Sequence, residues 1–257
     1  MIVTVQGPIM DGDNEPGVAS GEYVSEKLRE ARETESVKAV VLRVDSPGGS
    51  VFASELIRQE VLAVNAAGKP VVVARGSRAA SGGYWISAPA DNIWAEETTL
   101  TGSIGVFAYL QTYENLAARY GVYTDGVGTT PLSALRGAGI GPLPEASKDL
   151  IQQSVEHTYD DFLSRVAEGR DLSVERVAEI AEGRGWSGKD AKELQLVDAF
   201  GGRTDAIDNA ASLAGLEDWD VTTGEKSLSK IEQFLKDLGA DVSAGLMSGA
   251  LRAFVGG

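Results

Sequence analysis

The fold is decided by residues 37–50, which read Val-Lys-Ala-Val-Val-Leu-Arg-Val-Asp-Ser-Pro-Gly-Gly-Ser. The first eight residues are mostly β-branched or apolar, which is typical of a strand buried on both faces. The glycine pair allows a tight turn, and Ser50 is a suitable N-cap for the helical pattern that continues to Ala66. A strand, a glycine turn and a helix in this order indicate a parallel α/β unit.

The same pattern recurs on both sides of this unit. A strand at Ile2–Gln6 precedes a helix at Glu22–Glu33, and a strand at Val71–Ala74 precedes a short apolar helix at Ala79–Ala88 that starts near Ser81. This alternation predicts parallel strands joined by helical crossovers. We also expect strands at 92–95 and 105–110, an extended segment at 121–127, a loop at 128–144, and helices at 113–120, 144–169, 173–182, 188–193, 205–214 and 226–238.

Composition narrows the classes of function. The 257 residues are 43% hydrophobic and 24% charged, as in an ordinary soluble globular protein. The net charge of −15 argues against binding to nucleic acid or to anionic lipid. The absence of cysteine excludes disulfides, thiolate metal sites and a cysteine nucleophile.

The chain divides, on this pattern, into a domain at 1–215 and a C-terminal helix and tail at 216–257. No stretch approaches the ~20 apolar residues of a transmembrane helix, and the first residues enter a strand pattern at once, so we expect the chain itself to be soluble. Any targeting segment would lie outside this sequence. Asp160 and Asp161 are interpreted as a solvated helix face, and we expect neither a metal nor a cofactor.

Two glycine turns each follow a strand and precede a helix: Gly48-Gly49 and Gly82-Gly83. Paired glycines let backbone amides point into a cleft at the ends of the strands, where they can hold an anion. A simple strand-to-helix turn is the alternative for each. Phosphate binding is disfavoured because neither the GxxxxGK[ST] nor the GxGxxG spacing is present.

Ser81 stands at the head of the second turn's helix. A hydroxyl placed there, among small residues, lies where the helix dipole and free amides stabilise a developing oxyanion. The alternative is an ordinary N-cap, which contributes about 1 kcal/mol to stability. The presence of two such turns favours the nucleophile.

Four motifs carry a resemblance to a known family. They are Val-Leu-Arg-Val-Asp-Ser-Pro-Gly-Gly-Ser (41–50), Gly-Lys-Pro-Val-Val-Val (68–73), Ala-Ala-Ser-Gly-Gly-Tyr-Trp-Ile-Ser (79–87) and Leu-Thr-Gly-Ser-Ile-Gly-Val (100–106). In order and spacing they resemble the signal peptide peptidase A family, also called protease IV, of peptidase family S49. The likeness extends to about residue 210. It implies a ClpP/crotonase-like fold, a spiral of βαβ units, to which the sequence adds a helical C-terminal extension.

The resemblance also implies a site and a chemistry. It makes Ser81 the nucleophile of a serine endopeptidase that uses a Ser/Lys dyad and degrades cleaved signal peptides. The amide of Gly82 would help to form the oxyanion hole, with Gly48 and Gly49 lining it. Ser103 would orient the lysine base.

The general base is where the chain departs from the family's pattern. Single-domain members carry a Gly-Lys-Tyr-Lys-like run some fifty residues after the nucleophile, whereas residues 128–133 read Gly-Thr-Thr-Pro-Leu-Ser, and no lysine lies between Lys69 and Lys148. Arg136 cannot replace it because guanidinium stays protonated. The lone histidine, His157, lies in a polar helical stretch and is expected to be a solvated surface residue.

The chain therefore resembles the C-terminal half of the tandem members of the family, in which the N-terminal half supplies the lysine. We expect the base to come from such a half or from a partner chain in a ring-forming oligomer. For the full protein the resemblance implies the periplasmic face of the bacterial inner membrane. Two alternatives stay open: a non-catalytic assembly or binding half, and a crotonase-like acyl-CoA enzyme, which the acidic surface and the 79–84 run disfavour.

Further expectations concern four single residues. Asp45 is assigned a structural role, accepting backbone hydrogen bonds at its turn. Tyr84, Trp85 and Phe107 are assigned to the core or to subunit contacts, with a wall of the substrate groove as the alternative.

Overall fold

The computed structural model describes residues 1–12, 17–124, 129–130 and 143–224. The chain forms two units, Met1–Thr222 and Thr223–Gly257, and all but the first two residues of the second unit lie outside the described part. The helix predicted at 226–238, Arg136 and most of the predicted 128–144 loop also lie outside it. The division into a domain at 1–215 and an extension at 216–257 therefore stays a prediction.

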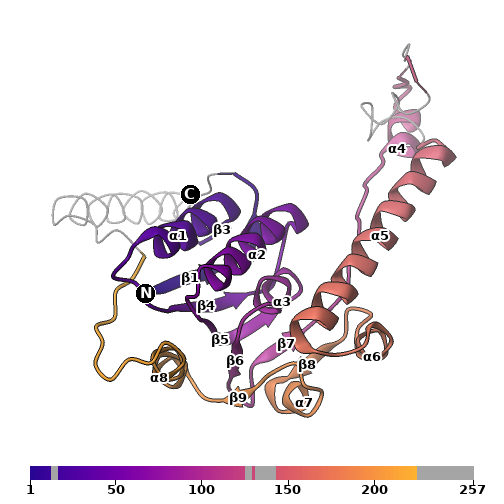
Figure 1. Cartoon of the computed structure of the whole chain (residues 1–257). Coiled ribbons are helices and arrows are strands. Elements are labelled where there is room, and N and C mark those ends of the chain that lie inside the picture. Colours follow the sequence, from indigo (N-terminus) through magenta and orange to yellow (C-terminus); the bar gives the residue numbers. More distant parts are fainter. Residues whose placement is uncertain (13–16, 125–128, 131–142, 225–257) are drawn as a thin grey trace, which may run out of the picture. The chain divides into compact units, whose positions relative to one another are not determined.

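A predominantly parallel sheet forms the centre of the first unit (Figure 1). Five strands lie in the order β1-β4-β5-β6-β9, and every neighbouring pair among them is parallel. β7 pairs in parallel with the end of β5, and β8 pairs with β7 in the antiparallel direction. The strands are β1 (Ile2–Gln6), β4 (Val40–Ser46), β5 (Val71–Ala80), β6 (Asn92–Ala95), β7 (Leu100–Gly102), β8 (Gly185–Ser187) and β9 (Ala199–Phe200), with a separate parallel pair, β2 (Ile9–Met10) and β3 (Ala19–Ser20).

Several helices begin directly after a capping hydroxyl. The side chains of Ser20, Ser50 and Ser173 accept a hydrogen bond from the backbone N–H three residues on, which satisfies one of the free donors of the first turn. The predicted N-cap at Ser50 is therefore confirmed. The helices are α1 (Gly21–Glu33), α2 (Val51–Ala66), α3 (Gly82–Ser87), α4 (Glu114–Arg119), α5 (Glu145–Arg170), α6 (Val174–Ile180), α7 (Gly188–Glu193) and α8 (Arg203–Leu213).

The sheet is covered on both faces, which explains why its strands lack a polar alternation. Alternate residues of β4 enter opposite cores: Leu42 and Val44 belong to the cluster formed with α1 and α2, whereas Val41 packs with Ala206 and Ala210 of α8. Figure 1 shows α1 and α2 on one side of the strands and α8 apart from them. This arrangement is the one expected for a parallel sheet in an α/β protein.

Two expectations about secondary structure were wrong around the second glycine turn. β5 continues to Ala80, so the helix predicted from residue 79 begins only at Gly82. The strand predicted at 105–110 is irregular, and the strand of this region is β7, five residues earlier. β7 has hydrogen-bonding neighbours on two sides, whereas the 105–110 segment has no neighbouring strand among the described residues and its Phe107 is 87% exposed.

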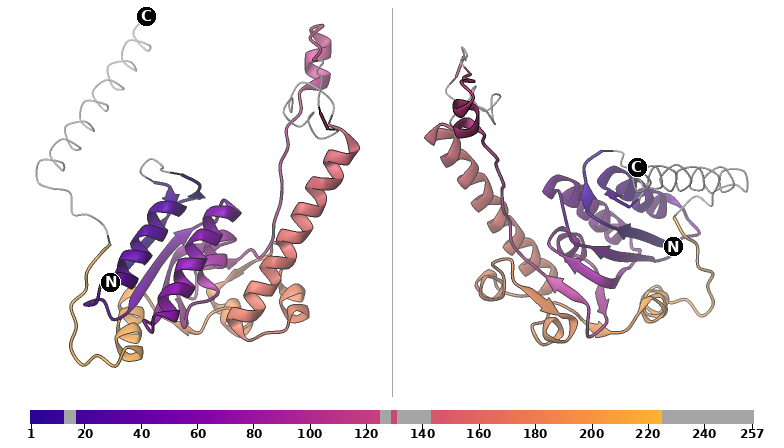
Figure 2. Two further views of the ribbon diagram at one scale, coloured as in Figure 1. Left: turned by 45° about the horizontal axis from the view of Figure 1, so that its top comes forward. Right: turned by 180° about the vertical axis from the view of Figure 1, so that it is seen from behind.

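The long helix α5 has two unlike halves. Its C-terminal half packs into the main core through Phe162 and Val166, whereas most side chains of its N-terminal half are exposed or only partly buried. The segment between β7 and α4 runs beside it in both views of Figure 2. Within the described residues, none of the helices has the combination of length and hydropathy required to cross a bilayer.

Candidate active site

Ser81 occupies a sharp turn between β5 and α3. Its backbone has φ 51° and ψ −120°, a conformation in the positive-φ region that residues with a side chain rarely adopt. The turn is held by hydrogen bonds from the Ser81 amide to the Gly102 carbonyl (3.0 Å) and from the Tyr84 and Trp85 amides to the Ser81 carbonyl (2.8 and 2.9 Å). Such a strained strand-to-helix turn costs about 1–3 kcal/mol, and it projects the side chain away from the backbone.

The Ser81 hydroxyl is not an N-cap. No side-chain capping bond forms at the start of α3, and no hydrogen-bond partner of Oγ occurs among the described residues. The residue is partly exposed, so the hydroxyl is reachable from solvent. The alternative interpretation of Ser81 as a simple cap is therefore wrong, and its oxygen is free to meet a substrate.

The first glycine turn lies against Ser81. A Cβ built on Gly48 would lie 2.5 Å from the Gly82 amide nitrogen and 2.7 Å from the Ser81 Cβ, and a Cβ on Gly82 would lie 3.2 Å from the Gly49 nitrogen. Gly48 has φ 96°, so this position needs glycine both for its conformation and for the close approach. The structure thus brings together the two turns that the sequence places more than thirty residues apart.

The amides of this turn are not equivalent. The Gly48 amide donates to Ser46 Oγ at 3.1 Å, whereas for the Gly49 and Gly82 amides the described residues offer no acceptor. Gly49 and Gly82 therefore supply the two unoccupied donors beside Ser81. Gly48 contributes by its lack of a side chain, and its amide is already satisfied.

Two adjoining cavities meet at Ser81. The larger has a volume of about 930 Å³ and includes Gly48, Gly49 and Ser103. The smaller has a volume of about 60 Å³ and includes Gly49 and Gly82. All five predicted site residues thus line one continuous region, although their catalytic roles stay predictions.

The described residues of this region do not include the lysine that a Ser/Lys dyad needs as its general base. Among the described residues, no lysine or histidine lines either cavity. His157 is exposed on α5, as predicted, and Lys148 forms an ion pair with Glu145 at 2.6 Å at the start of the same helix. The described part of the chain also holds no cluster of three or more acidic, histidine or cysteine side chains that could bind a metal.

A buried arginine supports the strands that carry the site. The Arg75 side chain, 1% exposed, donates to Thr101 Oγ1, which in turn donates to the Ala79 carbonyl at 2.7 Å. Its guanidinium lies 4.6 Å from the centre of the Tyr84 ring. Burial lowers the pKa of Arg75 to about 10, so the group stays charged at neutral pH. This contact joins β5 and β7 just before Ser81 and Ser103, and sequence reasoning missed it.

Other single-residue expectations are resolved by contacts. Asp45 Oδ1 accepts a backbone hydrogen bond, as predicted, but the donor is the Arg78 amide of β5 at 3.2 Å and not an amide of its own turn. Tyr84 and Trp85 are buried in the core, as expected. Phe107 is exposed and lines both cavities beside Ser81.

Sequence reasoning also missed Glu55, which lies behind the small cavity. Its carboxylate accepts hydrogen bonds from the Trp85 indole (2.8 Å), Arg165 Nε (3.1 Å), Arg58 and Gln59. Burial disfavours its charge, but the hydrogen bonds from Arg58, Gln59 and Trp85 outweigh that effect and lower the pKa of Glu55 to about 2. A signal existed in the sequence, because Glu55 stands one helical turn beyond a cap that adjoins the glycine turn.

Glu55 should therefore contribute to stability in a pH-dependent way. Because its folded-state pKa lies below the ordinary 4.5, its contribution is complete above pH 5 and is lost as the pH falls towards 2. We expect Glu55→Gln to lower the free energy of unfolding by about 2 kcal/mol at pH 7, with a smaller difference from the unsubstituted protein at pH 3. Urea unfolding at both pH values measures this.

The control for that experiment is Glu168→Gln, which removes an exposed carboxylate of α5. We expect less than about 0.5 kcal/mol of change from it at either pH. The stabilising effect is assigned to the ionised carboxylate of Glu55. If Glu55→Gln and the unsubstituted protein differ in free energy of unfolding by the same amount at pH 7 and pH 3, that assignment is wrong.

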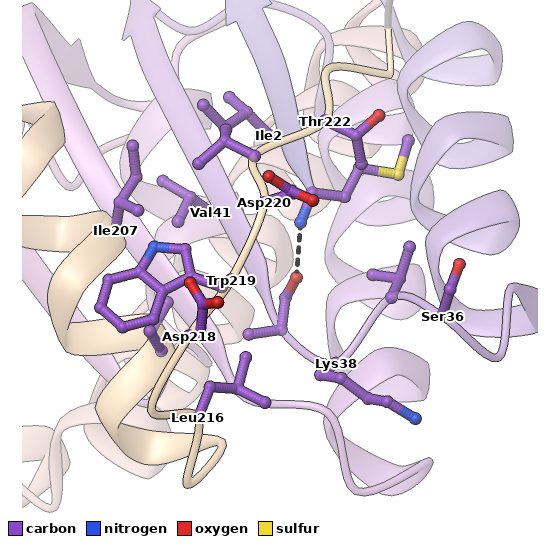
Figure 3. A pocket seen from close by; sticks show the side chains of 16 residues that line it. Ile2, Ser36, Lys38, Val41, Ile207, Leu216, Asp218, Trp219, Asp220 and Thr222 are labelled. Carbon is purple, nitrogen blue, oxygen red and sulfur yellow. Dashed lines mark hydrogen bonds between the residues drawn. The ribbon is translucent and has the colours of Figure 1, made fainter.

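A further cavity lies on the face of β1 and β4 that α8 covers, on the other side of the sheet from α1 and α2 (Figure 3). It has a volume of about 470 Å³, and its walls include Ile2, Val41, Ile207 and Trp219. Neither glycine turn contributes to it. The chemistry-bearing motifs therefore converge on the region around Ser81 and not on this cavity.

The chain is similar in sequence to proteins of a known family. The sequence profile of peptidase family S49 matches residues 63–217. The chain is 43% identical over 243 residues to Protease 4 of Salmonella typhi, an alignment that covers 95% of this chain and 39% of that protein. It is 38% identical over 216 residues to the chloroplastic serine protease SPPA of Arabidopsis thaliana, covering 84% of this chain and 31% of that protein. The chain thus spans well under half the length of these relatives.

A solved structure supports the architecture. A ClpP1 variant from Listeria monocytogenes superposes with a TM-score of 0.53 at 16% identity, covering 80% of this chain and 94% of that one. At this identity the likeness concerns the fold alone. The predicted ClpP-like α/β fold is confirmed.

Proposed function

Because the chain belongs to peptidase family S49, we propose that it supplies the nucleophile of a serine endopeptidase. The observation that carries the proposal is the conformation of Ser81, whose hydroxyl projects from a strained turn beside the amides of Gly49 and Gly82; within the described part of the chain, none of these three groups has a hydrogen-bond partner. A nucleophile next to preorganised donors is the arrangement required for acyl transfer.

In the proposed reaction, Ser81 Oγ attacks the carbonyl carbon of the scissile peptide bond and gives its proton to a base. The carbonyl oxygen becomes an oxyanion, which the amides of Gly49 and Gly82 stabilise. The C–N bond then breaks, the leaving amine takes the proton, and an acyl-enzyme on Ser81 remains. Water hydrolyses this ester with the same base, which restores the serine.

The base is proposed to be a lysine from outside this chain, either in an N-terminal half of the same protein or in a partner subunit. A lysine acts as a base when burial or nearby positive charge lowers its pKa. Ser103 is proposed to orient this lysine, which is supported by its position in the wall of the same cavity as Ser81. The lack of lysine and histidine around the described site supports an external source.

An exposed aromatic segment supports the presence of a neighbouring subunit. Phe107 and Tyr109, on the segment that follows β7, and Tyr120 and Tyr123, just after α4, are 78–87% exposed. Large aromatic side chains gathered on one surface mark contact sites in soluble proteins. We propose that they pack against the lysine-bearing half or against the next subunit of a ring.

The proposed substrates are cleaved signal peptides or other apolar peptides in extended form. The walls of the larger cavity include Met10, Val106 and Phe107, which are apolar, and the first glycine turn, Gly48-Gly49. Backbone edges can pair with an extended peptide, while side-chain pockets select its residues. For a protein with these substrates, the proposed place of action is the periplasmic face of the bacterial inner membrane.

An acylation experiment tests the external base. We expect a fluorophosphonate probe to label Ser81 of this chain alone at least about 10²-fold more slowly than in a complex with the lysine-bearing half, because a general base contributes 10²–10⁴-fold. A half in which that lysine is replaced by arginine is the matched control and should give no acceleration. Rapid labelling of the chain alone would contradict the proposal.

The second candidate is a non-catalytic assembly half, which the lack of a base among the described residues also favours. It predicts that adding the lysine-bearing half produces neither labelling nor hydrolysis of a signal peptide. The acyl-CoA alternative loses support, because the family that matches is a peptidase family.

A further inference from the structure

Two aromatic rings that contact each other, Trp85 and Phe162, line the small cavity beside Ser81 in addition to Phe107. The Trp85 and Phe162 rings have their centres 4.7 Å apart at an angle of 53°. Trp85 is only 3% exposed, and both rings line the cavity together with Ser81 and Gly82. Ser81 and Gly82, which would hold the substrate carbonyl in the proposed reaction, both line this cavity, and the cavity is assigned on that ground to the side chain on the acyl side of the scissile bond.

The volume of this cavity limits the size of the side chain that it can hold. A cavity of roughly 150 Å³ is needed to hold a benzene ring, whereas this one measures about 60 Å³. A methyl or small branched group fits the available space, and an aromatic ring does not. The Trp85 indole is one of the side chains that bound this volume, so a shift of the indole would change it.

The indole is held in place by a carboxylate on another helix. Trp85 Nε1 donates to Glu55 Oε2 at 2.8 Å, across from α3 to α2. Arg58 Nε donates to the same oxygen at 3.0 Å, and Gln59 Nε2 donates to Oε1 at 2.6 Å. The carboxylate is thus fixed by its own helix before it orients the tryptophan.

The same carboxylate connects the cavity to α5. Arg165 Nε donates to Glu55 Oε2 at 3.1 Å, and its guanidinium lies 4.8 Å from the Trp85 ring centre. Arg165 is held from its own helix by Asp161 at 3.1 Å. Phe162, on α5, completes the wall. One glutamate therefore ties together α2, α3 and α5 around the small cavity.

We propose that Glu55 is a positioning residue for substrate selection: it holds Trp85 and α5 against the small cavity, so that peptides with a small aliphatic acyl-side residue are accepted and those with an aromatic one are rejected. The proposal rests on the function proposed for Ser81. It concerns a group that touches neither the substrate nor Ser81 and acts through the indole.

Peptide hydrolysis by the complete enzyme is the first test. We expect Glu55→Ala to lower the ratio of kcat/KM for an alanine over a phenylalanine acyl-side residue by at least about 10-fold, because the indole is released. Glu55→Gln should lower it less, since an amide oxygen still accepts the indole N–H. Glu60→Gln, which removes another ion-paired glutamate of α2, should leave the ratio unchanged.

A role in stability alone makes a different prediction. It lowers the amount of folded enzyme but leaves the ratio between the two peptides constant, because both are cleaved by the same folded fraction. The Trp85→Phe background separates the two roles. If Glu55 acts through the indole, Glu55→Gln has no further effect on the ratio once Trp85 is replaced. An equal effect in both backgrounds would overturn the proposal.

A binding measurement keeps the proposal testable without hydrolysis. In the Ser81→Ala variant with ¹⁵N-labelled tryptophan, the Trp85 indole resonance is identified by its loss in Trp85→Phe. We expect the alanine peptide to shift it, and Glu55→Gln to improve binding of the phenylalanine peptide relative to the alanine peptide by at least about threefold.

The two proposals can thus fail separately. Altered binding preference without any hydrolysis would leave the role of Glu55 intact and reject the peptidase. Hydrolysis with unchanged ratios, an unmoved indole resonance and unchanged binding in Glu55→Gln would reject the role of Glu55 and leave the peptidase intact.

Discussion

Replacing Ser81 with alanine is expected to lower kcat/KM of the complete enzyme for a signal-peptide substrate by at least about 10⁴-fold, because no acyl-enzyme can form without the hydroxyl. The remaining rate should come from binding and from the two free amides. Steady-state hydrolysis of a fluorogenic peptide and loss of fluorophosphonate labelling both measure the effect.

Ser54→Ala is the matched control for this substitution. Ser54 lines the small cavity, but its hydroxyl donates to the Ser50 carbonyl at 2.7 Å and is not free to attack a substrate. We expect less than about a tenfold fall in kcat/KM from its loss, which removes one local hydrogen bond. Ser81→Ala should also keep the fold, because its hydroxyl caps no helix. Retention of more than about 1% of activity by Ser81→Ala would reject Ser81 as the nucleophile.

Much of the fold could be predicted because it depends on short-range patterns. The apolar run before Asp45 and the capping hydroxyl of Ser50 each determine their local structure, and the strand and helix lie where these signals place them. The irregular segment at 105–110 shows the limit of such signals. Its sequence has strand propensity, but a strand also needs a neighbour, and the neighbour is supplied to β7 instead.

The sequence could predict which residues lie together at the site, but not how their hydrogen-bonding groups are arranged. Sequence order shows that two glycine turns follow strands, and parallel strands bring such turns to one edge. It does not show that the Gly48 amide is already bonded to Ser46, which leaves Gly49 and Gly82 as the donors. Nor does it show Glu55 meeting Trp85, since that contact depends on how α2 packs on α3.

The second large effect is expected from Gly82→Ala. The backbone of Gly82 does not have positive φ, so alanine is tolerated conformationally. Its methyl group, however, would lie 2.5 Å from Ser54 Oγ and 3.2 Å from the Gly49 nitrogen, in the space beside the two donors. We expect kcat/KM to fall by about 10²–10³-fold, the range for loss of an oxyanion-hole donor, with the fall mainly in kcat.

A second substitution separates this effect from simple crowding. Ser54→Ala in the Gly82→Ala background removes the closest contact, yet it leaves the methyl next to the Gly49 amide, so activity should stay low. Gly68→Ala is the control for glycine replacement: its φ of 77° makes alanine costly for stability, but no atom lies within 4 Å of the added methyl. It should lower the free energy of unfolding and leave kcat/KM nearly unchanged. If Ser54→Ala restores the activity of Gly82→Ala, the methyl acts by crowding that serine, and the prediction that it obstructs the space beside the two amides is wrong.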